Sequence, residues 1–323
     1  MTTLTVSADA LTRARQVVAP HVLRTATRRW PLLERLTGTE TWLKHENHNP
    51  TAAFKVRGGL TYLSRLREEQ PGRGVISASR GNHAQSLAYA GGVFGVPVTI
   101  VVPVGNSPDK DAATRAYGAE VVVHGSDFQE SVEHARTLAE ERGLHMVPAI
   151  HPWLVEGVAT YPAEMHEDAP GLDRVYVPVG MGSGISAHLA VRDLLGLSTE
   201  VVGVVAEGAP AYALSVAAGR PVATERADTF VDGVACRVPD PSAVATMVAG
   251  GVRVVVVSDQ QAKQAMVELY RATHNLVEPA GALGLAAATA EREANAGRRI
   301  GLVLTGGNAD HDVLEAAFAA SAG

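Results

Sequence analysis

The segment N-P-T-A-A-F-K-V-R-G-G, residues 49–59, places Lys55 among small and apolar residues, two positions before a second basic residue, which a pair of glycines follows. Burying a lysine as an ammonium ion is costly unless a partner neutralises the charge or a reaction removes it. One such reaction is condensation of the amine with the aldehyde of a cofactor, which gives an imine. The alternative is a solvated lysine on the surface of a helix, so other segments must decide between the two.

Three glycine-containing segments each follow a predicted strand and are candidates for binding an anion. They are S-R-G-N-H at residues 79–83, G-M-G-S-G at residues 180–184 and T-G-G-N at residues 305–308. Ligands of parallel α/β sheets bind beyond the carboxyl ends of the strands, where backbone N–H groups at a helix start attract negative charge. The second segment has neither the G-x-G-x-x-G pattern nor the G-K-[ST] ending of an ATP-binding loop. It therefore predicts either a phosphate site of another kind or a purely structural turn.

The elements that must position these segments are short strands that alternate with helices. The predicted strands are the apolar runs G-V-I-S-A-S, V-P-V-T-I-V-V-P, A-E-V-V-V-H, R-V-Y-V-P-V, E-V-V-G-V-V-A, R-V-V-V-V-S and R-I-G-L-V-L-T. Ser107 and Pro108 predict the start of one helix and Gly118 its end, and a second helix spans residues 127–142 and stops at Gly143. This alternation predicts an α/β fold with doubly wound parallel sheets.

Composition and charge exclude several classes of function. The chain has 323 residues, with 28 Lys and Arg, 34 Asp and Glu, and a formal net charge of −6. This charge gives no reason to expect nucleic acid or an anionic membrane as partner. No apolar run approaches the roughly 20 residues of a membrane span, and no secretory signal is visible. The only cysteine is Cys236, so an intramolecular disulfide is excluded and a cytoplasmic location is expected.

The order of these segments along the chain resembles a known family. K-x-E-N-x-N-P-T-x-x-F-K-x-R-G, S-x-G-N-H-A-Q, a glycine turn after V-P, E-P-A-G and T-G-G-N follow one another between Lys44 and Asp310. This set resembles the fold-type-II pyridoxal-phosphate enzymes, whose architecture is tryptophan synthase β-like. Within them it is similar to the threonine/serine dehydratase and serine racemase branch. The resemblance implies pyridoxal 5′-phosphate as cofactor, held covalently by Lys55.

The resemblance also assigns residues around that cofactor. Phe54 lies near the ring, Thr305 lies beside the pyridine nitrogen, and Asn82 hydrogen-bonds the ring hydroxyl, with a helix cap as its alternative role. The phosphate is received by the backbone of the glycine turn, which comprises Gly180, Met181, Gly182, Ser183 and Gly184. Met181 and Ser183 depart from the family's run of glycines, but backbone donors do not depend on side chains. A neutral hydroxyl beside the pyridine nitrogen makes the ring a weaker electron sink than a carboxylate would, which suits elimination.

The reaction that the resemblance implies is the elimination of water from an L-β-hydroxy amino acid, with threonine and serine as expected substrates. The α-carboxylate is received by the loop of Ser79, Arg80, Gly81, Asn82 and His83. The Lys55 amine, once released from the cofactor, removes the α-proton as general base. The β-hydroxyl leaves with help from an acid, for which the resemblance suggests the cofactor phosphate. The product then hydrolyses to a 2-oxo acid and ammonia.

Arg80 and Trp153 bear on related reactions and other substrates. Racemases of this branch need a serine base just before G-N-H, where this chain has Arg80, and arginine is a poor base. F-K-V-R-G and G-N-H-A-Q favour elimination over β-replacement. Arg80 is either a partner for a side-chain carboxylate, as in 3-hydroxyaspartate, or a surface residue. Trp153 either packs on an aromatic substituent, as in phenylserine, or belongs to the core. The remote alternative is a nucleotide-binding α/β protein in which Glu207 holds a ribose.

The resemblance further implies two domains and a homodimer. Residues 1–72 and 156–323 form the large cofactor-binding domain, and residues 73–155 form a small mobile domain inserted in it, which closes on the substrate. A divalent or monovalent cation stays open as a second cofactor. Glu207 matches one ligand position of the family, but Ala211 and Ala213 follow it.

Overall fold

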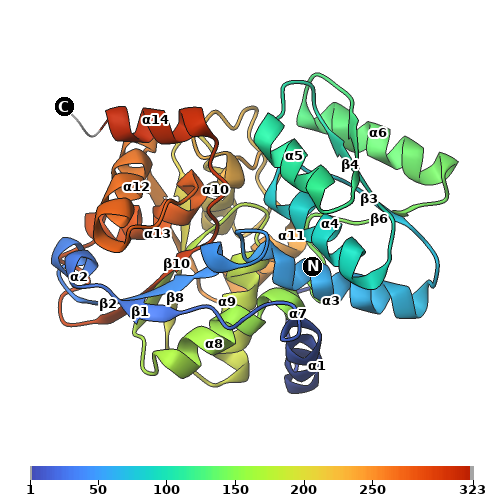
Figure 1. Cartoon of the computed structure of the whole chain (residues 1–323). Coiled ribbons are helices and arrows are strands. Elements are labelled where there is room, and N and C mark those ends of the chain that lie inside the picture. The colour runs from blue at the N-terminus through green and yellow to red at the C-terminus, as the bar shows by residue number, and fades with distance from the viewer. Residues whose placement is uncertain (1, 321–323) are drawn as a thin grey trace.

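Two β-sheets covered by helices form the framework of the computed structural model, which describes residues 2–320 (Figure 1). Residue 1 and residues 321–323, which the predicted domain ranges include, lie outside the described part. The larger sheet has the strand order β1 (Thr27–Arg29), β2 (Glu40–His45), β10 (Arg299–Leu304), β7 (Arg174–Pro178), β8 (Glu200–Ala206) and β9 (Arg253–Val257). All pairs of neighbouring strands in this sheet run parallel except β1 and β2, which are antiparallel. The predicted doubly wound parallel sheets are therefore confirmed, and β1, which was not predicted, is the one antiparallel edge strand.

The smaller sheet comes from a single stretch of the chain and is entirely parallel. Its strand order is β5 (Glu120–Val123), β4 (Val98–Val102), β3 (Val75–Ala78) and β6 (His145–Met146). Every predicted strand is present in one of the two sheets. Three strands were not predicted, namely β1, β2 and β6, because they are very short or carry charged residues instead of a continuous apolar run.

Helices connect and cover the strands. They are α1 (Ala8–Val18), α2 (Pro31–Thr37), α3 (Lys55–Glu69), α4 (Asn82–Phe94), α5 (Pro108–Ala116), α6 (Phe128–Glu141), α7 (Pro152–Val158), α8 (Thr160–Asp168), α9 (Ser183–Leu194), α10 (Ala211–Ala218), α11 (Pro241–Ala249), α12 (Asp259–Thr273), α13 (Pro279–Ala290) and α14 (His311–Ala319), with 3₁₀ turns η1 (Glu46–His48) and η2 (Asp232–Val234). The predicted helix start at α5 is confirmed, because Ser107 Oγ accepts a hydrogen bond from Lys110 N–H at 3.2 Å. No helix among residues 2–320 is long and apolar enough to cross a membrane.

Apolar side chains cover both faces of the larger sheet, as the alternation along β7 illustrates. Val175 and Val177 lie in one buried cluster with residues of α8 and α9, whereas Tyr176 between them lies in a second cluster with residues of α12 and α13. Leu60 and Leu63 of α3 share a third cluster with β3 and α4. This helix, which the predicted ranges assign to the large domain, thus shares its core with the smaller sheet, and the domain division stays a prediction.

Candidate active site

Lys55 is the first residue of α3, where the positive end of the helix dipole disfavours a charged ammonium. Its Nζ donates a hydrogen bond to Ser183 Oγ at 2.8 Å and lies 5.1 Å from the centre of the Phe54 ring. Burial lowers the pKa of the Lys55 amine to about 8, while the nearby Glu278 carboxyl acts in the opposite direction. The amine therefore loses its proton more readily than a solvated lysine, as a nucleophile or a base requires.

The glycine turn of residues 180–184 joins β7 to the start of α9. Gly182 has a φ of +94°, and a Cβ at this position would lie 2.6 Å from Ala243 Cβ, so the turn requires glycine. A Cβ on Gly180 would lie 2.4 Å from the Gly233 carbonyl oxygen. The first N–H groups of a helix have no acceptor within it, and the helix dipole is positive at this end. The turn is thus suited to receive an anion.

Side chains behind the glycine turn hold its backbone in place. The Met181 carbonyl accepts a hydrogen bond from the Tyr212 hydroxyl at 2.9 Å, and that hydroxyl accepts one from Asp240 N–H at 3.1 Å. The Met181 sulfur lies 3.7 Å from Sγ of the buried Cys236. The turn therefore has a fixed shape before any ligand binds.

Thr305 follows β10 and has a buried hydroxyl. The residue is 5% exposed, and its Oγ1 has no hydrogen-bond partner among residues 2–320. Its carbonyl accepts a hydrogen bond from Phe54 N–H at 3.0 Å, and Ala53 pairs with Gly306 in an isolated β-bridge. These backbone contacts join Thr305 to the segment that carries Lys55. Because an unpartnered buried hydroxyl is costly, Thr305 Oγ1 is available to a polar ligand.

Asn82 and Glu278 form a hydrogen-bonded pair across the site. Asn82 is the first residue of α4, and its Nδ2 donates to both carboxyl oxygens of Glu278 at 2.9 Å. Its Oδ1 accepts a hydrogen bond from Asn308 Nδ2 at 2.8 Å. The alternative role of Asn82 as helix cap is not observed, because Gly81 occupies the cap position. These contacts bring the carboxyl ends of β3 and β10 together.

Glu278 is the functional residue that the sequence reasoning missed. It is 6% exposed, and burial raises the pKa of its carboxyl to about 7, with Asp232 adding to the rise and the hydrogen bond from Asn82 opposing it. A carboxyl with such a pKa can exchange a proton at neutral pH. The signal was a lone acidic residue directly before the apolar run P-A-G-A-L-G-L that forms α13, and E-P-A-G was used only as part of a family pattern.

The loop of residues 79–83 leads from β3 into α4. Ser79 Oγ accepts hydrogen bonds from the N–H groups of Gly81 at 3.4 Å and Ala84 at 3.1 Å, which fixes the loop. The Lys110 side chain lies against Gly81, since a Cβ there would be 3.2 Å from Lys110 Cδ. The loop is therefore held from within and by α5.

Arg80 and His83 differ sharply in their surroundings although they belong to the same loop. Arg80 is exposed, and its guanidinium forms no hydrogen bond or ion pair within the described part of the chain. His83 is 9% exposed, and its Nε2 has no partner among the described residues. Burial, with a smaller contribution from Lys55, lowers the pKa of His83 to about 3, so its ring is neutral.

Trp153 lies in an aromatic cluster. Its ring centre is 5.4 Å from that of Tyr62 and 4.8 Å from that of His151, and the Arg65 guanidinium lies 5.7 Å from it. None of these contacts involves Lys55 or the loop of residues 79–83. The prediction that Trp153 meets an aromatic substrate gains no support from its position, and core packing, its alternative role, accounts for the residue.

Glu207 lies exposed just after β8, and its N–H donates to the Val257 carbonyl at 2.8 Å. Within residues 2–320, no group of three or more His, Cys, Asp or Glu side chains is placed to hold a metal ion. The surroundings of Glu207 therefore do not support the cation site. The nucleotide-binding alternative also lacks support, because it leaves the buried Lys55 amine and Thr305 hydroxyl without a role.

Comparison with known proteins identifies the family. Residues 18–306 match the family described as pyridoxal-phosphate dependent enzyme. The chain belongs to this family. The L-threonine ammonia-lyase of Thermotoga maritima is 32% identical to it over 311 residues, which are 96% of this chain and 77% of that protein. The beta-hydroxyaspartate dehydratase of Paracoccus denitrificans is 32% identical over 303 residues, which are 93% of this chain and 96% of that protein.

A solved structure of the same family has the same fold. The processed form of threonine deaminase isoform 2 from Solanum lycopersicum superposes with a TM-score of 0.89 and is 27% identical, covering 99% of this chain and 95% of that one. The predicted fold-type-II architecture and the resemblance to the threonine dehydratase branch are thereby confirmed. Membership of the family also implies pyridoxal phosphate as the cofactor of this chain.

Proposed function

We propose that this protein is a pyridoxal-phosphate-dependent ammonia-lyase that eliminates water from an L-β-hydroxy amino acid and yields a 2-oxo acid and ammonia. The observation that carries the proposal is the convergence of the Lys55 amine, the glycine turn and the unpartnered Thr305 hydroxyl at the carboxyl ends of neighbouring strands. These groups match the aldehyde, the phosphate and the ring nitrogen of the cofactor. The names of both relatives, an ammonia-lyase and a dehydratase, support the same reaction.

Each residue proposed to hold the cofactor contacts a different part of it. When bound, pyridoxal phosphate supplies an aldehyde that condenses with amines and a conjugated ring that draws electrons from the substrate α-carbon. Lys55 provides the amine, and Phe54 packs beside the ring. Residues 180–184 receive the phosphate through backbone N–H groups. Asn82 meets the ring hydroxyl, and Thr305 offers the ring nitrogen a neutral hydroxyl, which suits elimination.

The chain's own residues carry the proton transfers and orient the substrate. The Lys55 amine, with a pKa of about 8, removes the α-proton as general base once the substrate has displaced it. Backbone N–H groups of residues 79–83, at the start of α4, hold the α-carboxylate. Closure of residues 73–155 over the substrate excludes water. Arg80 stands where a racemase needs its second base, so elimination is favoured over racemisation.

Arg80 also supports a more specific choice of substrate. Its guanidinium has no partner among the described residues and belongs to the loop proposed to hold the α-carboxylate. Arginine binds carboxylates with a planar, two-pronged geometry. We therefore include 3-hydroxyaspartate beside threonine and serine, in agreement with the name of the Paracoccus relative. Phenylserine, which depended on Trp153, receives no such support.

The test is a visible absorption spectrum of the purified protein, read before and after addition of L-threonine, L-serine and L-threo-3-hydroxyaspartate, with 2-oxo acid assayed in the same samples. We expect a cofactor band that is lost in Lys55→Ala, and oxo acid from at least one substrate. Arg80→Ala should lower kcat/KM for 3-hydroxyaspartate by roughly tenfold or more and leave threonine within about twofold, as the loss of a charged hydrogen bond predicts. A coloured protein that yields no oxo acid would refute the elimination reaction.

Two further properties belong to the same proposal. We propose a homodimer located in the cytoplasm, as the family resemblance and the single cysteine Cys236 suggested. Light scattering on the purified holoenzyme tests the homodimer, because a dimer has twice the chain mass of 33.7 kDa and a monomer has that mass once. Cell fractionation decides the second.

A further inference from the structure

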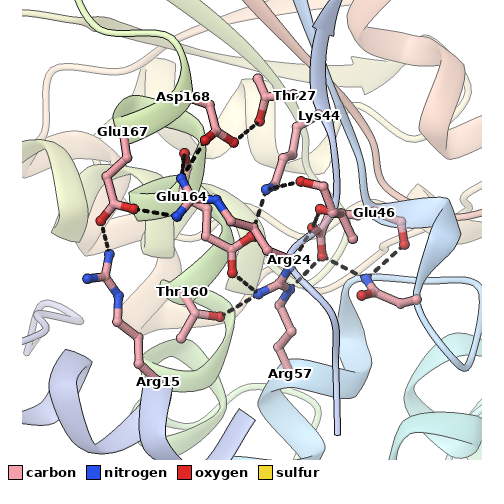
Figure 2. A network of polar contacts seen from close by, with 12 residues as sticks. Arg15, Arg24, Thr27, Lys44, Glu46, Arg57, Thr160, Glu164, Glu167 and Asp168 are labelled. Carbon is pink, nitrogen blue, oxygen red and sulfur yellow. Dashed lines mark hydrogen bonds and ion pairs between the residues drawn. The ribbon is translucent and has the colours of Figure 1, made fainter. Parts of the chain in front are cut away.

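A buried ionic network lies beside the start of α3 (Figure 2). The side chains of Lys44, Glu46 and Arg57 are 0% exposed, and that of Glu164 is 15% exposed. Two positive and two negative charges therefore balance one another away from water. Lys44 Nζ donates to Glu164 Oε2 at 2.7 Å, and Arg57 lies between the two carboxylates.

Arg57 is the centre of this network, and every nitrogen of its guanidinium is used. Nε and Nη2 bind the two oxygens of Glu46 at 2.8 and 3.0 Å. Nη1 and Nη2 bind the two oxygens of Glu164 at 2.7 and 3.0 Å, and Nη1 also donates to Thr160 Oγ1 at 3.0 Å. Such paired contacts fix the plane and the position of a guanidinium, which an ammonium cannot reproduce.

The network anchors the helical turn that carries the catalytic lysine. Lys55 and Arg57 are the first and third residues of α3, whose first turn has no side-chain cap and no acidic residue. Arg57 ties this turn to Glu46 in η1 and to Glu164 in α8. The Lys55 carbonyl also accepts a hydrogen bond from Ser86 Oγ at 2.6 Å.

The same network reaches the strand end that carries Thr305. In the parallel pairing of β2 with β10, His45 lies opposite Leu304. Glu46 directly follows His45, and Thr305 directly follows Leu304, so the two residues leave the sheet at the ends of neighbouring strands. Arg57 therefore connects the start of α3 to the edge of the sheet from which the Thr305 hydroxyl is presented.

We propose that Arg57 is a positioning residue that sets the separation between the Lys55 amine and the Thr305 hydroxyl. The inference rests on the proposed function, because these two groups are assigned to opposite ends of one cofactor ring. Stability alone does not explain the network, since a buried ion pair contributes little more than well-packed apolar side chains would. A fixed geometry at the catalytic amine does explain it, because small displacements of reacting groups lower rates and affinities strongly.

The test compares Arg57→Lys with the matched control Arg174→Lys in the full-length holoenzyme. Arg174 is also buried, at 5% exposure. It also binds a carboxylate through two nitrogens, since its Nε and Nη2 both lie 2.7 Å from Glu200 Oε2. It begins β7, at the end of the strand remote from the glycine turn. Both variants keep the positive charge and lose the two-pronged contact. For each, unfolding in urea, the cofactor dissociation constant of the apoprotein and the pH dependence of the cofactor's absorption band are measured.

We expect both variants to lose stability to a similar degree but only Arg57→Lys to disturb the cofactor. Its cofactor dissociation constant should rise at least about tenfold, and its absorption band should titrate at a different pH from that of the wild type. Arg174→Lys should stay within about twofold of the wild type in both. If Arg57→Lys fails to fold, the double variant Arg57→Met with Glu46→Gln, which keeps the net charge balanced, replaces it with the same expectations.

The opposite results overturn the inference in recognisably different ways. An Arg57 variant that loses stability yet keeps the wild-type dissociation constant and titration would reduce Arg57 to a structural residue. Equal disturbance in the Arg174→Lys control would mean that the cofactor responds to stability in general. A wild-type protein without any cofactor band would overturn the proposed function as well, which the two preceding outcomes leave intact.

Discussion

At the scale of single residues, burial moves the proton affinities of two groups toward neutral pH from opposite sides. It lowers the pKa of the Lys55 amine to about 8 and raises that of the Glu278 carboxyl to about 7. Both shifts have the same first cause, because burial disfavours the charged form of either group. The site therefore contains both an amine that can lose its proton and a carboxyl that can keep one near neutral pH.

Glu278 should make the stability of the apoprotein depend on pH. Its pKa rises on folding from an ordinary 4.5 to about 7, so the folded protein holds a proton that the unfolded chain has released. The contribution to stability is complete below pH 4.5 and is lost as the pH rises through 7. Between pH 5 and 8 the wild type should lose on the order of 2 kcal/mol relative to Glu278→Gln. Urea unfolding of both apoproteins at several pH values measures this, and a constant difference between them would contradict the raised pKa.

The sequence identified residues whose role depends on type and order, and missed those whose role depends on contacts. Lys55, Asn82 and Thr305 stand within ordered family patterns, and the structure brings their surroundings together. Glu278 and Arg57 belong to the same patterns, yet their importance lies in burial and in partners distant along the chain. Spacing alone does not reveal such partners.

At the scale of elements, the sequence predicted best where a single periodicity dominates. Continuous apolar runs gave every predicted strand, and glycine endings gave the limits of α5 and α6. The strand β2 was missed because T-W-L-K-H mixes apolar and charged residues, and its Lys44 is paired with Glu164 from α8, which is distant along the chain. Its character as a strand is set by pairing with β10 rather than by its own composition.

The glycine turn gives a prediction for one element. Gly182→Ala should lower the free energy of unfolding by roughly 1–2 kcal/mol for its positive φ alone, and should also clash with Ala243. Gly196→Ala is the matched control beyond the other end of α9, since it too has a positive φ, of +63°, but nothing within 4 Å of the added Cβ. We expect both variants to be less stable, and only Gly182→Ala to bind pyridoxal phosphate at least about tenfold more weakly.

Titration of the two apoproteins with cofactor, beside urea unfolding, makes this comparison. Equal cofactor affinity in Gly182→Ala and Gly196→Ala would mean that the turn of residues 180–184 does not receive the phosphate. The proposed roles of Met181 and Ser183 would then fall with it, since both rest on the same backbone.

At the scale of the whole molecule, polar contacts join the part of the chain built on the smaller sheet to the part built on the larger one. Ser107 Oγ donates to Asp310 Oδ1 at 2.6 Å, and Lys110 Nζ donates to Asp232 Oδ2 at 2.6 Å. With the pair of Asn82 and Glu278, they place α4 and α5 against the loops of the larger sheet. All these contacts lie at the candidate site, so a ligand bound there and the relative placement of the two parts influence each other.

Substitution of Lys110 tests whether the two parts of the chain separate and close again in an equilibrium. The Lys110 side chain is 12% exposed and also lies 4.0 Å from Asp310, whereas that of Asp232 is 52% exposed. We therefore expect the ion pair to stabilise the observed placement by about 1 kcal/mol, the upper end of the range for exposed pairs. Lys110→Met should therefore raise hydrogen exchange at residues 79–83 and 305–310 by at most about fivefold, without global unfolding. Arg142→Met is the matched control, because its ion pair with Glu120, at 2.9 Å, lies wholly within the part built on the smaller sheet. Mass spectrometry of deuterium uptake in both variants measures the effect, and identical uptake at the two segments would mean that residues 73–155 do not open there. A selective increase would make the mobile small domain, so far inferred from resemblance, a measured property of this chain.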